Sequence, residues 1–283
     1  MMNRLLWTLR VAFAAVLLAP CAFANEIDGV LPEVGIGLPH DVSKDGFGSE
    51  IDWLIKITLI FITILFVIMV IWMLYAVFRH NEAHQAEYDH GDSKHSVRTA
   101  LLISAFIFAV VDGTLWVKST KDTNGIFWNH GKAEREAGAV HIEVNAHQWA
   151  WDARYAGPDG KFNTADDIVT LNDIRVPMDA PVVIQLASTD VIHSFYLPNF
   201  RVKQDAMPGQ ITRLWFQARE PGKFDIGCAQ HCGINHYKMK ARLTVLPREE
   251  YDAWAKDASA ASALAFDEKD KGAHWGWDWK PAP

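Results

Sequence analysis

Cysteine is scarce in this chain, with three residues among 283. No C-x-x-C-H sequence occurs, which excludes a fused domain carrying a c-type haem. Lysine and arginine are also nearly balanced across the flanks of the long apolar runs, so the positive-inside rule decides little about orientation. If Cys21 leaves with an N-terminal leader, only Cys228 and Cys232 remain, and no third thiol complicates their pairing.

The N-terminus has the pattern of an export signal. Arg4 and Arg10 precede an apolar run over residues 11–18, and Ala22-Phe23-Ala24 has the small-x-small form of a signal-peptidase site. The pattern predicts a cleaved signal peptide over residues 1–24. An alternative is lipidation of Cys21, because Leu18-Ala19-Pro20-Cys21 resembles a lipoprotein site.

Two apolar stretches predict a transmembrane helix hairpin over residues 51–118, after an irregular exported segment over residues 25–50. Trp53 to Phe78 is long enough to cross a hydrocarbon core of ~30 Å, and Thr99 to Val117 is marginally so. A cleaved leader places residues 25–50 outside, so the chain returns outside after the second span. The sequence therefore predicts a multi-pass protein of a bacterial inner membrane, with its folded part on the periplasmic side.

One acid lies inside the second predicted span. Asp112 is near the outer end, where water or Lys118 can satisfy its charge. A role in proton handling is the alternative, because an acid within a span is a candidate functional residue.

The part of the chain after the hairpin has the pattern of an all-β domain, over residues 119–258. Short runs with β-branched or aromatic residues are separated by Pro, Gly or Asp turns, which is typical of a sandwich or barrel. The predicted strands are Val140–Asn145, Val182–Leu186, Ile211–Phe216, Phe224–Gly227 and Ala241–Leu246. A closing helix is expected over Glu249–Lys256, followed by a tail over residues 259–283 to which no chemistry is assigned.

Soft metal ligands are concentrated between Cys228 and Met239, in the sequence C-A-Q-H-C-G-I-N-H-Y-K-M. Two thiols, an imidazole and a thioether suit a copper ion that exchanges one electron. A disulfide and a zinc site are alternatives, although Met is a poor zinc ligand. A single blue copper needs only one Cys, so the two Cys indicate two thiolates that bridge two metal ions.

A candidate for a second imidazole lies upstream, at His193 in the sequence S-T-D-V-I-H-S-F. This segment and the C-x3-C-x3-H-x2-M loop together resemble subunit II of the haem-copper cytochrome c oxidases, which carries the dinuclear CuA centre. The resemblance implies a cupredoxin-like Greek-key barrel. It implies a ligand set of bridging Cys228 and Cys232, together with His193, His236, Met239 and the backbone carbonyl of Gln230.

The same resemblance implies that the chain is the electron-accepting subunit of a terminal oxidase. Electrons from cytochrome c pass through CuA to haem in subunit I, where oxygen is reduced and protons are pumped. The expected partners are cytochrome c, subunit I, other oxidase subunits and the bilayer, with no nucleic acid. The CuA subunit of a nitric oxide reductase and a copper-delivery protein are the alternatives.

Aromatic residues are concentrated in an earlier segment, from His147 to Tyr155, with the sequence H-Q-W-A-W-D-A-R-Y. The segment resembles an aromatic motif of the family, which implies that Trp149 is where electrons from cytochrome c enter. The alternative is that Trp149, Trp151 and Tyr155 are simply core aromatics of a strand. The family commonly has another aromatic at the position of Ala150, so the docking surface differs here.

Two departures from the family concern other sites. Glu is usual at the position of Gln230 and also reaches a magnesium ion, so the amide leaves the magnesium site unsupported. His95 and Arg98 stand where the family has a Glu and a Trp linked to proton uptake, which makes His95 a candidate for proton entrance. Lys203 and Asp205 do match the family's K-x-D-x-x-P-G segment, and are expected between the copper site and subunit I.

A second, harder donor set lies on the Gly-containing turn between Tyr155 and Val169. Asp159, Asn163, Asp166 and Asp167 offer oxygen atoms at a spacing that can surround a calcium ion, although the turn is not an EF-hand. A hydrated hairpin without metal is the alternative.

Overall fold

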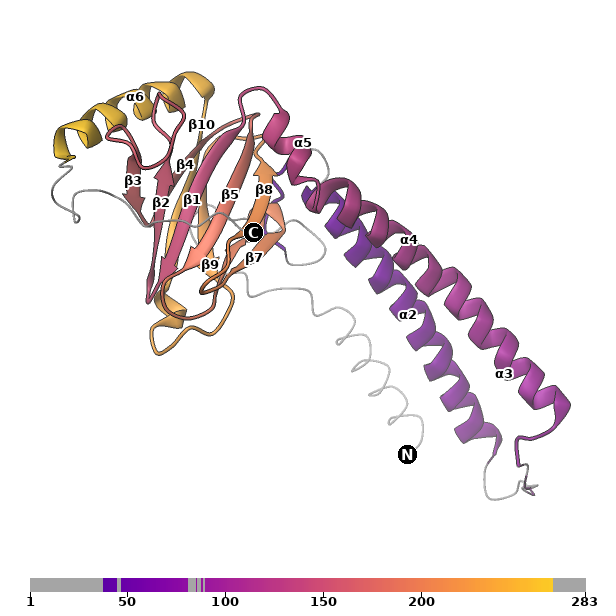
Figure 1. Ribbon diagram of the computed structural model, residues 1–283. Helices are drawn as coiled ribbons and strands as arrows, with labels where there is room; N and C mark the ends of the chain where they lie inside the picture. Colours follow the sequence, from indigo (N-terminus) through magenta and orange to yellow (C-terminus); the bar gives the residue numbers. More distant parts are fainter. Residues whose placement is uncertain (1–37, 45–46, 81–84, 86–87, 89, 267–283) are drawn as a thin grey trace, which may run out of the picture. The chain divides into compact units, whose positions relative to one another are not determined.

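The computed structural model describes residues 38–44, 47–80, 85, 88 and 90–266 (Figure 1). The chain divides into two units, Met1–His40 and Asp41–Pro283, and every element below belongs to the second. The predicted signal peptide over residues 1–24, Cys21 with its alternative lipidation, and the tail beyond residue 266 lie outside the described residues.

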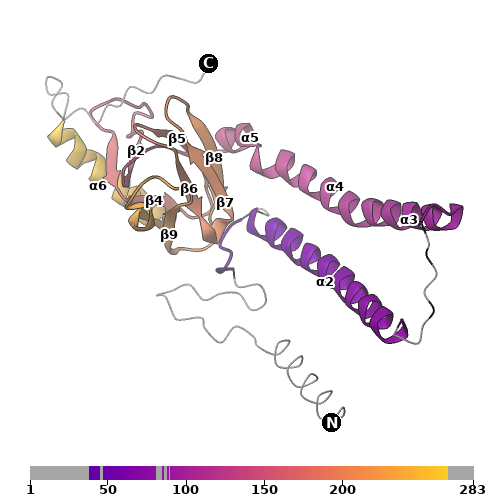
Figure 2. The ribbon, with the colours of Figure 1, turned by 90° about the horizontal axis from the view of Figure 1, so that it is seen from below.

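Two long apolar helical rods form the predicted hairpin. α2 (Phe47–Arg79) is a 33-residue helix, and a second rod over Lys94–Arg135 is also apolar and long enough to span a membrane. The large apolar side chains of α2 are exposed on all sides, as expected of a helix that faces lipid. Both rods extend beyond the predicted spans at each end. Figure 2 shows them as separate rods beside each other.

The second rod is not one uniform α-helix. α3 (Lys94–Ile107) begins after Ser93, whose hydroxyl accepts a hydrogen bond from the Ser96 backbone N–H at 3.0 Å. A π-helical turn, Phe108–Asp112, then precedes α4 (Gly113–Asp122), and a second one, Thr123–Phe127, follows it. The first π-helical turn ends at the acid that interrupts the apolar run.

The second rod ends with α5 (His130–Arg135), and ten strands after it form two five-stranded sheets, as predicted for an all-β domain. The first sheet has the order β3-β2-β1-β5-β8 and the second β4-β10-β9-β6-β7. Most pairs are antiparallel, but β1 pairs with β5 and β4 with β10 in parallel, which requires chain crossings between the sheets. The strands are β1 (Val140–His147), β2 (Ala150–Tyr155), β3 (Ile168–Leu171), β4 (Asp173–Pro177), β5 (Pro181–Ser188), β6 (His193–Leu197), β7 (Val202–Ala206), β8 (Thr212–Gln217), β9 (Gly222–Cys228) and β10 (Lys240–Leu246).

The core lies between the two sheets. Alternating strand positions, such as Ile142 and Val144 of β1 and Ile184 and Leu186 of β5, are fully buried there. The closing helix is longer than predicted: α6 (Arg248–Ala265) packs on β3, β4 and β10 (Figure 1). α6 thereby covers one end of the sandwich, and the loops that follow β5 and β9 lie at the opposite end.

A nearly buried ion pair joins the hairpin to the β domain, and two others lie within the hairpin. Arg201, between β6 and β7, donates to both carboxylate oxygens of Asp52 at 2.9 and 3.0 Å, and both side chains are nearly buried. Lys118 pairs with Glu50 of α2 and with Asp122. Lys118 is therefore bound to these two acids, and the interpretation that it satisfies Asp112 is not what the structure shows.

Candidate metal centre

The Cys228–Met239 loop is closed at its base by two strands. β9 ends at Cys228 and β10 begins directly after Met239, and Gly227 and Lys240 pair across the antiparallel ladder. The Cys228 backbone N–H also donates to the Met239 carbonyl at 3.2 Å. The first and last predicted ligands of the loop are therefore held side by side.

His193 reaches the loop because it is the first residue of β6. β6 pairs with β9 so that Phe195 faces Cys228, and the Ala229 backbone N–H donates to the Ser194 carbonyl at 2.9 Å. Ser194 is buried and its hydroxyl donates to Asp205 at 2.6 Å. The predicted distant imidazole is thus brought to the loop by sheet pairing.

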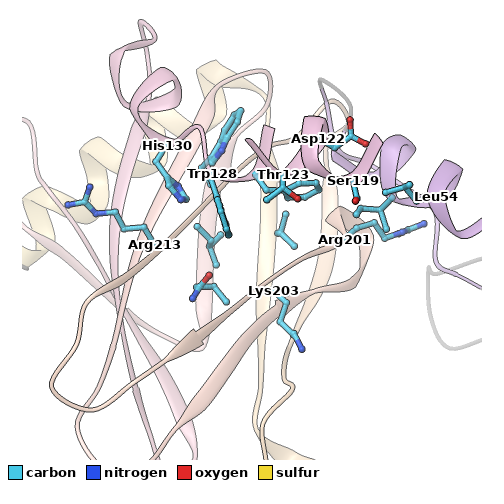
Figure 3. Close-up of a pocket in the computed structure, with 15 residues that line it drawn as sticks. Leu54, Ser119, Asp122, Thr123, Trp128, His130, Arg201, Lys203 and Arg213 are labelled. Carbon is cyan, nitrogen blue, oxygen red and sulfur yellow. The ribbon is translucent and has the colours of Figure 1, made fainter. Parts of the chain in front are cut away.

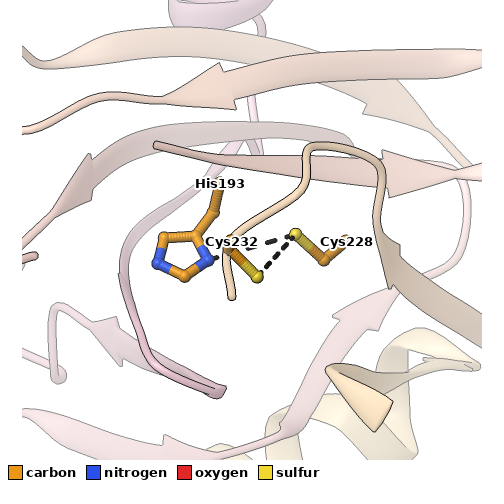
Figure 4. A group of neighbouring side chains, drawn as sticks. All are labelled: His193, Cys228 and Cys232. Atoms are coloured by element: carbon orange, nitrogen blue, oxygen red, sulfur yellow. Dashed lines mark hydrogen bonds between the residues drawn. The ribbon is translucent and has the colours of Figure 1, made fainter. Parts of the chain in front are cut away.

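The two thiols and His193 form a tight cluster (Figure 4). Cys228 Sγ lies 3.7 Å from Cys232 Sγ and 4.0 Å from His193 Nδ1, and all three donor atoms lie within 4.8 Å of one another. A disulfide needs about 2.05 Å between sulfurs, so the two thiols are free. Within the described part of the chain, no other group of three or more His, Cys, Asp or Glu residues converges in this way.

The other three predicted ligands border the same cluster. His236 Nδ1 and Met239 Sδ lie 3.5 and 3.7 Å from Cys232 Sγ. The carbonyl oxygen of Gln230 is 3.2 Å from Cys228 Sγ, and its side chain is exposed. Two thiols, two imidazole nitrogens, one thioether and one carbonyl therefore face a common space, a donor set that fits copper.

Asp190 orients His193 and was not singled out from the sequence. Its Oδ1 lies 2.8 Å from His193 Nε2, and its Oδ2 accepts a hydrogen bond from the Gln148 backbone N–H at 2.6 Å. A carboxylate only accepts, so in the neutral ring Nε2 carries the hydrogen and the Nδ1 lone pair faces the sulfurs. The available signal was an acid three residues before the His in S-x-D-V-x-H-S.

The two thiols differ in acidity. Partial burial disfavours the Cys228 thiolate, but hydrogen bonds with His193 and with backbone groups of Ser194 and Gln230 lower the pKa of Cys228 to about 6. Burial, and then the neighbouring Cys228 sulfur, raise the pKa of Cys232 to about 12. Without metal, one thiolate is therefore present at neutral pH, and the second proton must leave when a metal binds.

Trp149 touches the metal loop through its indole. It is partly exposed, and its Nε1–H donates to the Cys232 carbonyl at 3.2 Å, as does the Gln148 side-chain amide at 2.8 Å. Gly233 makes this approach feasible: it has a φ of +120°, and a Cβ there would lie 2.8 Å from Gln148 Nε2 and 3.2 Å from Trp149 Cζ2. The roles of Gln148 and Gly233 were missed from the sequence.

The neighbouring aromatics Trp151 and Tyr155 are core residues. Trp151 is fully buried and packs edge-to-face on Phe195 and near the His193 ring, with centroids 5.2 and 6.0 Å apart. The Tyr155 hydroxyl accepts a hydrogen bond from the Arg175 backbone N–H at 2.8 Å. Trp149 alone of the three reaches both the surface and the metal loop.

The oxygen donors of the predicted calcium turn are bonded to the chain itself. Asn163 Oδ1 accepts from Arg154 Nη1 at 2.6 Å, and Asp167 Oδ2 accepts from the Asn163 N–H at 2.7 Å and lies 3.8 Å from Arg154 Nε. Asp166 Oδ2 accepts from the Asp159 N–H at 3.2 Å, and Asp159 Oδ1 accepts from another backbone N–H at 2.8 Å. These contacts favour the metal-free turn, and calcium binding stays a prediction.

The other predicted positions are more peripheral. Lys203 is exposed on β7, whereas Asp205 supports the strand that carries His193 through Ser194. His95 and Arg98 lie in the first turns of α3 and are exposed. Their predicted roles at subunit contacts and in proton uptake stay predictions.

A cavity of about 320 Å³ lies elsewhere, between the outer ends of the hairpin and strands β7 and β8 (Figure 3). Lys203 lines it together with Arg201 and Arg213, and the latter two are already paired with Asp52 and Glu134. None of the predicted copper ligands lines this cavity, so it is separate from the metal cluster.

Comparison with known proteins converges on one family. The family model described as cytochrome c oxidase subunit II, periplasmic domain, matches residues 140–245. The alternative cytochrome c oxidase subunit 2 of Bradyrhizobium diazoefficiens is 30% identical over 243 residues, which cover 76% of this chain and 82% of the relative. Cytochrome c oxidase subunit 2 of Cereibacter sphaeroides is 27% identical over 260 residues, covering 80% of this chain and 82% of the relative.

A solved structure is similar to part of this chain. The crystal structure of the periplasmic domain of subunit II of cytochrome oxidase of Bradyrhizobium japonicum is 28% identical, with a TM-score of 0.39. The match covers 43% of this chain and 94% of that domain.

Proposed function

This chain belongs to the cytochrome c oxidase subunit II family and is a subunit of that oxidase, and on that premise we propose how it works. It accepts electrons from cytochrome c at a dinuclear CuA centre and passes them to haem in subunit I. Oxygen is reduced there and protons are pumped, so this chain holds none of the oxygen chemistry.

The convergence of six soft or neutral donors supports the copper assignment. Cys228 and Cys232 would hold copper through their thiolates, and His193 and His236 would hold it through Nδ1. The weaker ligands are the Met239 thioether and the Gln230 carbonyl. Copper held by this set supplies reversible one-electron transfer.

The chain contributes a partly buried cage. His193 is fully buried, and Met239 and Cys232 are only 1% and 3% exposed, so water has little access to these three ligands. Asp190 fixes the orientation of His193, and Trp151 packs close to its ring. Ligands that are already in place need little rearrangement when the charge of the centre changes.

Trp149 is the proposed position where electrons enter. The hydrogen bond from its indole to the Cys232 carbonyl gives a short covalent and hydrogen-bonded connection from the surface to a bridging thiol. Exposed apolar side chains of the two metal-bearing loops, including Ile192, Ile234 and Tyr237, lie at the same end of the domain. They form a surface on which cytochrome c can dock.

The proposed setting is a bacterial inner membrane. The two apolar rods support a membrane-spanning hairpin, and the matching family model describes a periplasmic domain. The copper centre is accordingly on the periplasmic side, where cytochrome c reaches it. Magnesium is not expected at the Gln230 side chain, because a neutral amide is a weaker ligand than a carboxylate for this hard ion.

The two alternatives are less well supported. A copper-delivery protein needs accessible ligands to hand over its ion, whereas Cys232 and Met239 are buried here. For a nitric oxide reductase, the same copper cluster is required, so only the identity of the assembled complex separates it from an oxidase.

The experiment is spectroscopic. We expect the purified oxidase to show a mixed-valence two-copper EPR signal that disappears from Cys232→Ser, whereas a one-copper blue spectrum would contradict the proposal. Trp149→Phe is expected to keep this signal and to lower the rate of cytochrome c oxidation at least about tenfold. Trp254→Phe changes another partly exposed Trp, which lies on α6 outside the metal loops, so it is the matched control and should change neither.

A further inference from the structure

An acid stands between two exposed aromatic rings on the second rod of the hairpin. Phe108, Asp112 and Trp116 follow one another at four-residue spacing, and Phe108 and Trp116 are 65% and 70% exposed. Asp112 is exposed as well. Side chains at this spacing form one stripe along a helical rod.

The stripe lies beside, rather than on, the face that meets α2. Val111 and Leu115 are partly covered, and so is Lys118, which reaches Glu50 of α2 from the same side. The stripe of Phe108, Asp112 and Trp116 is shifted by one residue, about 100° around the rod. It is therefore free to contact another molecule.

No cation of this chain neutralises Asp112 among the residues that the structure describes. Lys118 is bound to Glu50 and Asp122, and Thr114, two positions away, donates its hydroxyl to the Val110 carbonyl at 2.6 Å. No ion pair involves Asp112 within this part of the chain.

Asp112 also lies below the polar end of the hairpin. Lys118, with its two acidic partners, marks that end, and Asp112 is six residues further inward, which is about 9 Å along a helix axis. An aspartate side chain is too short to reach the interface from there, unlike a lysine or arginine. An ionised carboxylate exposed to lipid at this depth is unfavourable unless a partner neutralises it.

We propose that the stripe of Phe108, Asp112 and Trp116 is a docking surface for a membrane-spanning helix of another oxidase subunit, which presents a lysine or arginine to Asp112. The opposite charge is what the exposed carboxylate lacks, and membership of a multi-subunit oxidase supplies candidate helices. The rings of Phe108 and Trp116, one turn on either side, then cover the ion pair and keep lipid and water from it. This inference rests on the proposed function only in that a partner subunit exists.

The test uses the full chain expressed with the rest of the oxidase. Asp112→Leu is expected to lower the amount of partner subunit that co-purifies with the chain by at least about tenfold, because the ion pair is lost. In cells that lack the other subunits, the same variant should be present in the membrane at an equal or higher level than wild type, because an exposed charge has been removed. Asp112→Glu should assemble nearly as wild type, and Asp112→Asn should be impaired.

Two aromatic substitutions sharpen the test. Phe106 is 66% exposed, which matches Phe108, but it lies off the stripe. Phe108→Ala is therefore expected to weaken co-purification several-fold, whereas Phe106→Ala should leave it unchanged.

Several outcomes would overturn the inference. Undiminished assembly of Asp112→Leu would show that no subunit contacts the acid, and wild-type assembly of Asp112→Asn would show that the partner group is not a cation. Normal assembly with lost proton pumping would assign Asp112 to proton transfer instead. Failure of the copper assignment is distinguishable, because the two-copper EPR signal is measured separately on the wild-type oxidase and on the Asp112→Leu chain.

Discussion

Two loops of the β domain carry residues that are able to bind metal, and the structure treats them in opposite ways. In the Cys228–Met239 loop, the donor atoms converge and few of them are used by hydrogen bonds from other parts of the chain. In the turn from Asp159 to Asp167, the oxygen atoms accept hydrogen bonds from backbone N–H groups and from Arg154. Both loops have several donor atoms. The Cys228–Met239 loop differs from the turn because its donor atoms converge and remain available to a metal ion.

The largest expected difference between the loops concerns copper itself. Cys232→Ser should reduce bound copper from two ions to one or fewer per chain, because a hydroxyl is a poor ligand for a soft metal. Asp166→Asn, in the other loop, should leave both ions in place. Copper analysis and EPR of the two purified variants provide the measurement, and equal copper content would remove the distinction.

The free energy of unfolding, unlike copper binding, should depend on the contacts of the Asp159–Asp167 turn. The Arg154 side chain is fully buried and donates to Glu143 at 2.8 Å and to Asn163 at 2.6 Å. Arg154→Met leaves the buried carboxylates of Glu143 and Asp167 without this cation, which we expect to lower the free energy of unfolding by about 3 kcal/mol. Copper should stay bound under native conditions.

The matched control for this substitution is Arg248→Met. Arg248 pairs with Asp252 on the surface of α6, where both side chains are more than half exposed. Its removal should cost less than about 0.5 kcal/mol. Urea denaturation followed by circular dichroism would compare the variants, and similar midpoints would contradict the importance assigned to the buried pair.

Much of this arrangement follows from the sequence, and the limits have physical reasons. The thiols, His236 and Met239 were predicted because their chemistry and spacing lie within one loop, whereas His193, 35 residues before Cys228, needed the family resemblance. The five predicted strands correspond to β1, β5, β8, β9 and β10. β2, β3, β4, β6 and β7 were not predicted as strands, because polar or charged residues interrupt several of these short segments, such as Asp152 and Arg154 in β2.

Contacts made across the fold were the least accessible. The hydrogen bond from Trp149 to Cys232 joins residues 83 positions apart, so no local sequence pattern predicts it. The same holds for the ion pair of Arg201 with Asp52, 149 positions apart. Lys118 shows the same limit at short range. It is six residues from Asp112, but Asp122 is only four residues away, about one helical turn, and this is the acid that Lys118 contacts.

Removal of copper should expose a difference between the two thiols within the metal loop. With a pKa of about 6, Cys228 is mostly thiolate at pH 7, whereas Cys232, with a pKa of about 12, is almost entirely protonated. Iodoacetamide should therefore alkylate Cys228 at least about tenfold faster. Its rate should fall about tenfold per pH unit well below pH 6, as the thiolate is protonated.

Peptide mass spectrometry of the copper-free chain at a series of pH values gives both rates. Equal labelling of the two thiols at pH 7 would contradict the proposed effect of His193 on Cys228.

The smallest expected effect concerns the contact between the metal loop and the proposed electron-accepting surface around Trp149. Gly233→Ala should displace Gln148 and Trp149, because the added Cβ would be 2.8 Å from the Gln148 amide nitrogen. We expect a several-fold slower oxidation of cytochrome c with the copper signal retained. Gly227→Ala is the control, since a Cβ at that position meets nothing within 4 Å. Equal rates in both variants would exclude this route.

The two carbonyls of the loop have an evolutionary consequence. The carbonyl oxygen of Gln230 faces Cys228 Sγ, and the carbonyl oxygen of Cys232 accepts a hydrogen bond from Trp149. Both are main-chain atoms that every amino acid possesses. Meanwhile the side chains of Gln230, His231 and Ile234 are exposed. Mutations at these three positions can therefore accumulate without altering the atoms nearest the metal. The choice of redox partner is free to diverge between species, and open to engineering, while the centre itself is preserved.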